Sequence, residues 1–84
     1  MKTGEFYTVI IKKYCPYSES AIKLLKNRKK EYKEIDFHKL NYKLQNEIMN
    51  VIKELNNNEE YRLFPKIFKN DKFIGGYDKL SKMI

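Results

Sequence analysis

A nearly continuous apolar run, FYTVII at positions 6–11, constrains the fold of this chain more than any other segment. A strand with one wet face alternates apolar and polar residues, whereas a nearly continuous apolar run is typical of a strand covered on both faces. We therefore predict a central strand with other elements packed above and below it. A chain of 84 residues has room for one domain with one modest core.

Two amphipathic helices are predicted from apolar residues that recur every three or four positions. The first begins just beyond Cys15, because Pro16 suits a first helical turn and apolar residues follow at 21, 22, 24 and 25. The second has Asn41 as its cap and apolar residues at 44, 48, 51, 52 and 55, and it ends in the polar run 56–60.

Three shorter strands and a last helix complete the pattern. Residues 32–37 alternate partly, which predicts a strand near a sheet edge, and the Asn70-Asp71 pair separates 66–69 from 72–74, which predicts a hairpin. After Gly75 and Gly76, residues 77–84 have helical spacing, with Asp78 as cap or first-turn acid. The order is βαβαββα without repeat or linker, so we expect one domain spanning 1–84.

Charge and cysteine content limit the surroundings of the protein. The net charge of +7 favours anionic partners, but its lysines and arginines are dispersed, and the one cluster at 26–30 is explained by the solvated end of a helix. One cysteine permits no internal disulfide, which favours a reducing compartment. No apolar run is long enough for a signal peptide or a membrane span. We expect a soluble cytoplasmic protein with no membrane partner.

Cys15 is the best candidate for chemistry. A cysteine at a helix amino terminus with cationic neighbours has its pKa lowered, and the thiolate is the reactive form. Cys15 has both features, since Lys12 and Lys13 precede it and Pro16 starts the predicted helix. By composition alone a lone cysteine is more often inert, but its placement between a strand and a helix favours a catalytic thiol.

Three segments, KKYCPYS at 12–18, FPKIF at 64–68 and GGYDKL at 75–80, resemble the signature segments of glutaredoxins. They occur in the order and spacing of that family, and the resemblance spans essentially the whole chain. It implies the thioredoxin-like α/β fold, a four-stranded mixed sheet flanked by helices. The same βαβαββα order follows independently from the periodicity above.

The resemblance also implies a glutathione site around Cys15. Lys12 matches the lysine that stabilises the thiolate and meets a carboxylate of glutathione, and Pro65 matches a cis-proline that turns the backbone of residue 64 toward the cysteine. Asp78 matches the acid that receives the γ-glutamyl ammonium. The implied glutathione-binding residues are Lys12, Tyr17, Phe64, Pro65, Gly76, Tyr77 and Asp78.

Four of these residues also have a purely structural interpretation. Pro65 could only shape a loop, Gly76 only a turn, Asp78 only a cap, and Tyr17 could only cover the helix. Phe64 stands where the family usually has valine, which leaves the backbone role intact and alters the shape of the groove.

Ser18 replaces the second cysteine of the commonest motif, so the resemblance implies a monothiol oxidoreductase and electron-transport protein with glutathione as co-substrate. Its substrates would be glutathionylated proteins or small disulfides, and we expect a monomer. The alternative is a dimeric carrier of a 2Fe-2S cluster ligated by Cys15 and glutathione, against which Pro16 argues. A nucleic-acid-binding domain is the third and least favoured hypothesis. His38 has no partner at ligand spacing, so no other metal site is predicted.

Overall fold

The computed structural model describes residues 4–84, and β1 (Tyr7–Ile11) lies at the centre of its sheet. The strand order is β2-β1-β3-β4, where β2 is Tyr32–Asp36, β3 is Lys66–Lys69 and β4 is Lys72–Gly75. β1 pairs in parallel with β2 and antiparallel with β3, and β3 pairs antiparallel with β4. The predicted mixed four-stranded sheet, with the first strand central and the second at an edge, is confirmed.

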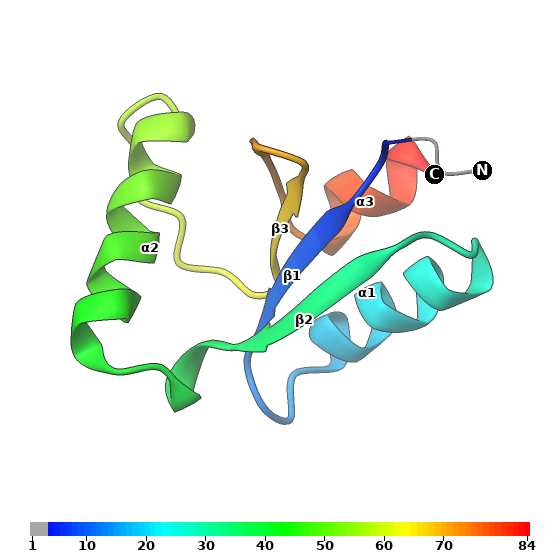
Figure 1. Cartoon of the computed structure of the whole chain (residues 1–84), viewed down its shortest axis with the longest axis horizontal. Coiled ribbons are helices and arrows are strands. Elements are labelled where there is room, and N and C mark those ends of the chain that lie inside the picture. The colour runs from blue at the N-terminus through cyan, green and yellow to red at the C-terminus, as the bar shows by residue number, and fades with distance from the viewer. Residues whose placement is uncertain (1–3) are drawn as a thin grey trace.

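Within residues 4–84, three α-helices flank the sheet, as expected. Figure 1 shows α1 (Pro16–Asn27) and α3 (Tyr77–Met83) on one face and α2 (Tyr42–Leu55) on the other. The sequence prediction missed one short element, the 3-10 turn η1 (Phe37–Lys39). The second strand ends at Asp36 rather than at residue 37, because the Asp36 carboxylate accepts a hydrogen bond from the His38 N–H and starts this turn.

The two faces of β1 explain its apolar run. Successive strand residues point to opposite sides of a sheet, so Tyr7 and Val9 face α1 and α3, whereas Ile10 faces α2. The buried cluster on the α1 and α3 side consists of Tyr7, Val9, Ala21, Leu25, Ile67 and Leu80. On the other side, Ile10, Phe37 and Ile52 are buried. Full burial of such side chains contributes about 1.5–3 kcal/mol each.

The apolar stripe of α2 is covered less than its amphipathic pattern predicts. Ile52 is fully buried, but Leu44, Val51 and Leu55 remain 43%, 47% and 49% exposed. The helix therefore packs on the sheet along a narrow line through Ile52. Its amino terminus is held by Asn41, whose side chain accepts a hydrogen bond of 2.9 Å from the Leu44 N–H, as the sequence predicts.

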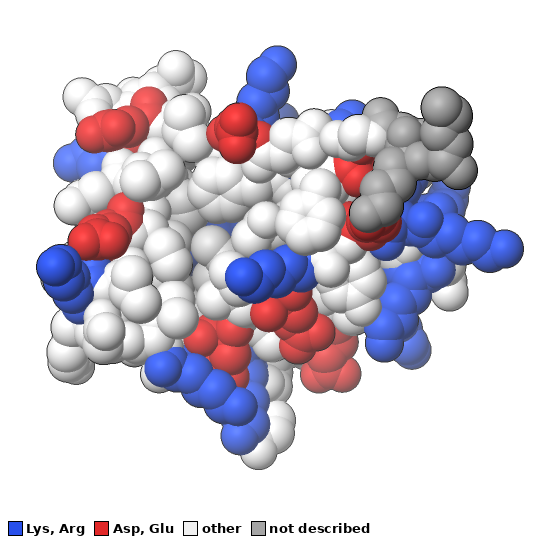
Figure 2. Space-filling model, viewed as in Figure 1, with Lys and Arg blue, Asp and Glu red and all other residues white. Residues whose placement is uncertain are grey.

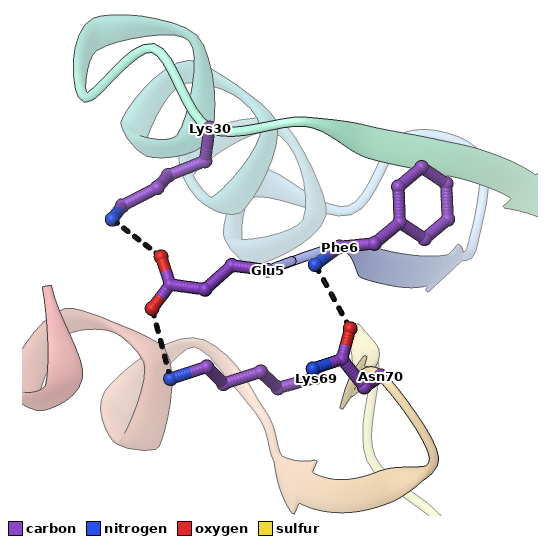
Figure 3. Close-up of polar contacts among 5 residues, drawn as sticks. All are labelled: Glu5, Phe6, Lys30, Lys69 and Asn70. Atoms are coloured by element: carbon purple, nitrogen blue, oxygen red, sulfur yellow. Dashed lines mark hydrogen bonds and ion pairs between the residues drawn. The ribbon is translucent and has the colours of Figure 1, made fainter. Parts of the chain in front are cut away.

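The segment before β1 is tied to both neighbouring parts of the sheet (Figure 3). The Glu5 carboxylate lies 2.9 Å from the Lys30 ammonium, just before β2, and 3.1 Å from the Lys69 ammonium at the end of β3. Hydrogen bonds from these two lysines lower the pKa of Glu5. The Phe6 N–H donates to the Asn70 side chain at 3.0 Å, and the Phe6 carbonyl accepts from the Asn70 N–H at 2.7 Å. The hairpin turn is thereby fastened to the start of β1.

The capping contact generates a stability prediction. Asn41→Ala should lower the free energy of unfolding by about 1 kcal/mol, because it leaves an N–H group at the start of α2 without its acceptor. Urea denaturation followed by circular dichroism measures the change.

The matched control is Asn50→Ala, the same substitution at an exposed position in the middle of α2. It should change the free energy of unfolding by no more than about 0.5 kcal/mol. Equal losses in the two variants would contradict the capping role of Asn41.

Candidate functional site

Cys15 lies where β1 passes into α1. The chain turns at Tyr14, whose φ of 61° is in the left-handed region, and Cys15 is the N-cap residue with Pro16 in the first helical turn. The thiol is partly exposed and free. The expected placement of this cysteine at a helix start is confirmed, and α1 directs its first backbone N–H groups toward the sulfur.

The electrostatic surroundings of the thiol favour the thiolate. Burial by itself raises the pKa of Cys15, but hydrogen bonds from the Ser18 N–H, the Ser18 hydroxyl and the Tyr17 N–H outweigh it. The positive charge of Lys12 acts in the same direction, and the net effect is a lowered pKa. The thiolate is therefore more populated at neutral pH than in an ordinary cysteine.

Ser18 has a structural role that the sequence did not reveal. It is 2% exposed, and its hydroxyl accepts a hydrogen bond of 3.4 Å from the Lys12 N–H besides reaching the Cys15 sulfur. The residue that replaces a second thiol thus connects both sides of the turn. Sequence reasoning treated it only as a missing cysteine.

The Phe64–Pro65 peptide bond is cis, as the resemblance of the FPKIF segment implied, and it lies beside the thiol. The Cys15 Sγ–H points to the Phe64 carbonyl oxygen at 3.9 Å. Pro65 is buried, and the pairing of Ile10 with Lys66 brings it to the carboxyl end of β1. The Phe64 ring packs against Phe37, with ring centroids 5.5 Å apart, so the ring and the carbonyl serve different contacts.

A groove of about 550 Å³ extends from Phe64 to the start of α3. Five of the implied glutathione-binding residues line it, namely Tyr17, Phe64, Gly76, Tyr77 and Asp78. The rings of Tyr17 and Tyr77 are 6.2 Å apart on one side. Asp78 lies in the first turn of α3, whose N-cap is Gly76, so of the two roles considered for Asp78 the structure shows the first-turn acid.

Lys12 and Cys15 do not line the groove. Lys12 is an exposed residue of the turn before α1, and Cys15 meets the groove through the Phe64 carbonyl. Of the implied residues, Lys12 and Pro65 lie outside the groove lining, and Lys12 lies on the Cys15 side of the site. Phe64 connects this side to the groove.

Tyr61 is a further groove residue that the sequence patterns did not indicate. A Cβ atom on residue 76 would lie 2.5 Å from the Tyr61 hydroxyl oxygen. Any residue other than glycine at position 76 would therefore displace the Tyr61 side chain. The Tyr61 ring packs on Phe73 with centroids 5.0 Å apart. Burial and, to a smaller extent, the charge of Asp78 raise the pKa of Tyr61.

Charged side chains of both signs are interspersed on the face seen in Figure 2, and lysines and arginines gather at the right, where α1 ends. No helix within residues 4–84 has the length and apolar character needed to cross a membrane. The described residues also contain no group of three or more His, Cys, Asp or Glu side chains that could hold a metal ion.

The fold is similar to those of solved glutaredoxins. A buckwheat glutaredoxin in complex with glutathione has a TM-score of 0.73 and 24% identity, over 90% of this chain and 64% of that protein. A wheat glutaredoxin has a TM-score of 0.73 and 27% identity, and the match covers 92% of this chain and 68% of that protein. Glutaredoxin 1 from Francisella tularensis, in complex with cacodylate, has a TM-score of 0.66 and 18% identity, and the match covers 93% of this chain and 90% of that protein. These likenesses show the thioredoxin-like fold.

No match was found among curated proteins. The sequence model of the glutaredoxin family matches residues 7–74, which is well over half of the 84 residues. This chain therefore belongs to the glutaredoxin family.

Proposed function

We propose that this protein is a glutathione-dependent thiol-disulfide oxidoreductase that works with a single cysteine. Two observations at Cys15 support the proposal: its pKa is lowered, and its thiol contacts the carbonyl of Phe64, a residue that lines the groove. Family membership supports thiol redox chemistry related to glutathione. The relative solved with glutathione supports this ligand.

The proposed reaction is the removal of glutathione from a mixed disulfide. The Cys15 thiolate attacks the glutathionyl sulfur, a new S–S bond forms, and the bond to the substrate sulfur breaks with its electron pair. The substrate leaves as a thiolate and takes a proton from water. A second glutathione thiolate then attacks the glutathionyl sulfur on Cys15, which yields oxidised glutathione and returns the electron pair to Cys15.

Glutathione would lie along the groove in an extended form. The backbone of Phe64 before cis-Pro65 would pair with its cysteinyl unit in the manner of an added strand. The γ-glutamyl end would reach Gly76, Tyr77 and Asp78, where the carboxylate of Asp78 suits its ammonium group. Lys12 and Tyr17 would contact the remainder of the tripeptide. The reaction consumes reduced glutathione, so the proposal includes a reducing compartment such as the cytoplasm.

Substitution of Cys15 tests the activity directly. Cys15→Ser should reduce glutathione-dependent reduction of a glutathionylated peptide to the uncatalysed rate, because a hydroxyl is not a nucleophile toward disulfides at neutral pH. The release of glutathione, coupled to a reductase that consumes its oxidised form, measures the rate. Equal rates for the wild type and the variant would rule the proposal out.

The hydrogen bonds from Ser18 generate a prediction about thiol reactivity. Ser18→Ala removes a hydroxyl that stabilises the thiolate, so the pKa of Cys15 should rise and alkylation at neutral pH should slow down. The pH dependence of iodoacetamide alkylation gives the pKa.

Ser20→Ala, the same substitution two residues further along α1, is the matched control and should leave this profile unchanged. Because the thiolate fraction grows with pH, the wild-type alkylation rate should rise through a midpoint below that of an ordinary cysteine. A midpoint at or above the ordinary value would contradict the assigned hydrogen bonds.

The alternative hypothesis is a carrier in which two copies share a 2Fe-2S cluster. Each copy would supply one protein ligand, the Cys15 thiolate, which is the one free cysteine among the described residues. One glutathione molecule bound to each copy would supply the other two ligands. Anaerobic reconstitution with iron, sulfide and glutathione distinguishes the hypotheses. Visible absorbance in a dimer would favour the carrier, and a colourless monomer would favour the exchange enzyme.

A further inference from the structure

Lys66 is a buried lysine next to the candidate site. It follows Pro65 directly, begins β3 and is only 1% exposed. Because Ile67 points into the α1 and α3 cluster, the Lys66 side chain points to the opposite face of the sheet, the side of α2. Lysine is almost never fully buried without a partner, and no carboxylate in residues 4–84 forms an ion pair with Lys66.

The contacts of the Lys66 ammonium all lie on one short stretch of chain, residues 61–64, which we name the 61–64 segment. The ammonium donates hydrogen bonds to the Tyr61 carbonyl at 2.6 Å and to the Leu63 carbonyl at 3.0 Å. It also lies 4.3 Å from the centroid of the Phe64 ring, within the range of a cation–π contact. Three of the four residues in the segment are thus held by one charged group.

The 61–64 segment carries both ends of the proposed glutathione groove. At one end the Phe64 carbonyl faces the Cys15 thiol at 3.9 Å. At the other end the Tyr61 hydroxyl lies against Gly76. The segment belongs to no helix or strand, so its conformation depends on side-chain contacts more than that of its neighbours does.

We propose that Lys66 is a positioning residue whose ammonium holds the 61–64 segment in the shape that binds the glutathione unit of the substrate. This inference rests on the proposed glutathione-dependent function and deepens it. Lys66 acts through Tyr61, Leu63 and Phe64 and does not touch the reacting sulfur atoms. It controls binding of the glutathionyl group, whereas Ser18 and the start of α1 control the reactivity of the thiol.

We call the contacts of the Lys66 ammonium with the 61–64 segment the clamp, and the burial of Lys66 makes this clamp sensitive to pH. Burial lowers the pKa of Lys66 to about 8. Above this pH the amine is neutral, so its attraction to the Phe64 ring is lost and its hydrogen bonds to two carbonyls weaken. The clamp is therefore complete below about pH 8 and weakens as the pH rises through that value.

Other titratable groups surround the groove, and the test separates them from Lys66. They are Tyr61 in the segment, His38 of η1 with its ring 5.9 Å from that of Phe64, Asp78 and Lys79 of α3, and Cys15 at α1. From the end of α2 only the uncharged Asn56 lines the groove. None of these groups is altered in a variant at position 66, so a pH effect that disappears with Lys66 belongs to Lys66.

Steady-state kinetics with a glutathionylated peptide test the inference in Lys66→Met, which keeps the length of the side chain and removes its charge. KM should rise about tenfold with a smaller change in kcat, because ground-state binding is lost. Iodoacetamide alkylation of Cys15 should change less than about twofold, since the groups that set its pKa are elsewhere. Lys72→Met, the same substitution at an exposed position of the hairpin, should match the wild type.

The pH dependence of KM distinguishes a positioning role of the charged Lys66 side chain from a purely structural role. Between about pH 7 and 9.5 the wild-type KM should rise, whereas that of Lys66→Met should stay high and flat. Lys66→Arg keeps its charge over this whole range, so its KM should stay low and flat. Parallel profiles in the wild type and Lys66→Met would overturn the inference.

Amide hydrogen exchange tests the clamp without any activity. Residues 61–64 should exchange faster in Lys66→Met than in Lys72→Met, while α1 stays unchanged. If the wild type showed no glutathione-dependent activity, the proposed function would fail. Amide hydrogen exchange of residues 61–64 would still show whether Lys66 holds this segment in place. Unaltered exchange in the 61–64 segment, or an unaltered KM in an active protein, would refute the positioning role.

Unfolding measurements check that Lys66→Met folds and that the charge is buried. The pKa of Lys66 is lower in the folded protein than in the unfolded chain, so the unfolded state binds more protons between about pH 8 and 10.5. The free energy of unfolding of the wild type should therefore rise relative to Lys66→Met as the pH increases over this range. A constant difference would mean that the ammonium is not desolvated, which would contradict the clamp.

Discussion

The antiparallel pairing of β1 with β3 holds together both the sheet and the candidate site. It joins the first strand to a segment more than fifty residues later, and it places Pro65 at the end of β1, beside the turn that carries Cys15. Both strands are buried on the face covered by α1 and α3, so a shift of one residue would turn Val9 and Ile67 out of the core. The same burial that stabilises the sheet thereby determines the geometry of the candidate site.

The candidate site divides into two parts with separate physical causes. The reactivity of the thiol comes from local structure, because Ser18, Tyr17 and Lys12 all lie within three residues of Cys15. The groove comes from long-range packing, since the 61–64 segment and the start of α3 meet only in the folded chain. Phe64 belongs to both parts, and the proposed reaction depends on its carbonyl keeping its place.

Much of the fold was predictable because the features that determine it are local. The helical spacing after Pro16, the cap at Asn41 and the Asn70-Asp71 turn each act within a few residues, and all three are present in the structure. The cis bond at Pro65 was implied by resemblance to a family, and the structure contains it. The partial exposure of α2 was not predicted, because periodicity identifies an apolar stripe without showing how much of it the sheet covers.

The amino-acid sequence was enough to predict the order of the elements, the central position of the first strand and the location of Cys15 at a helix start, because apolar periodicity and backbone capping act over short distances. The contact of Tyr61 with Gly76 and the burial of Lys66 became visible only in the folded chain, because they depend on segments that are distant in sequence. The burial of Lys66 is the clearest case. Lysine is an ordinary surface residue in any sequence pattern, and its two carbonyl acceptors come together only when the chain before Pro65 folds back over β3.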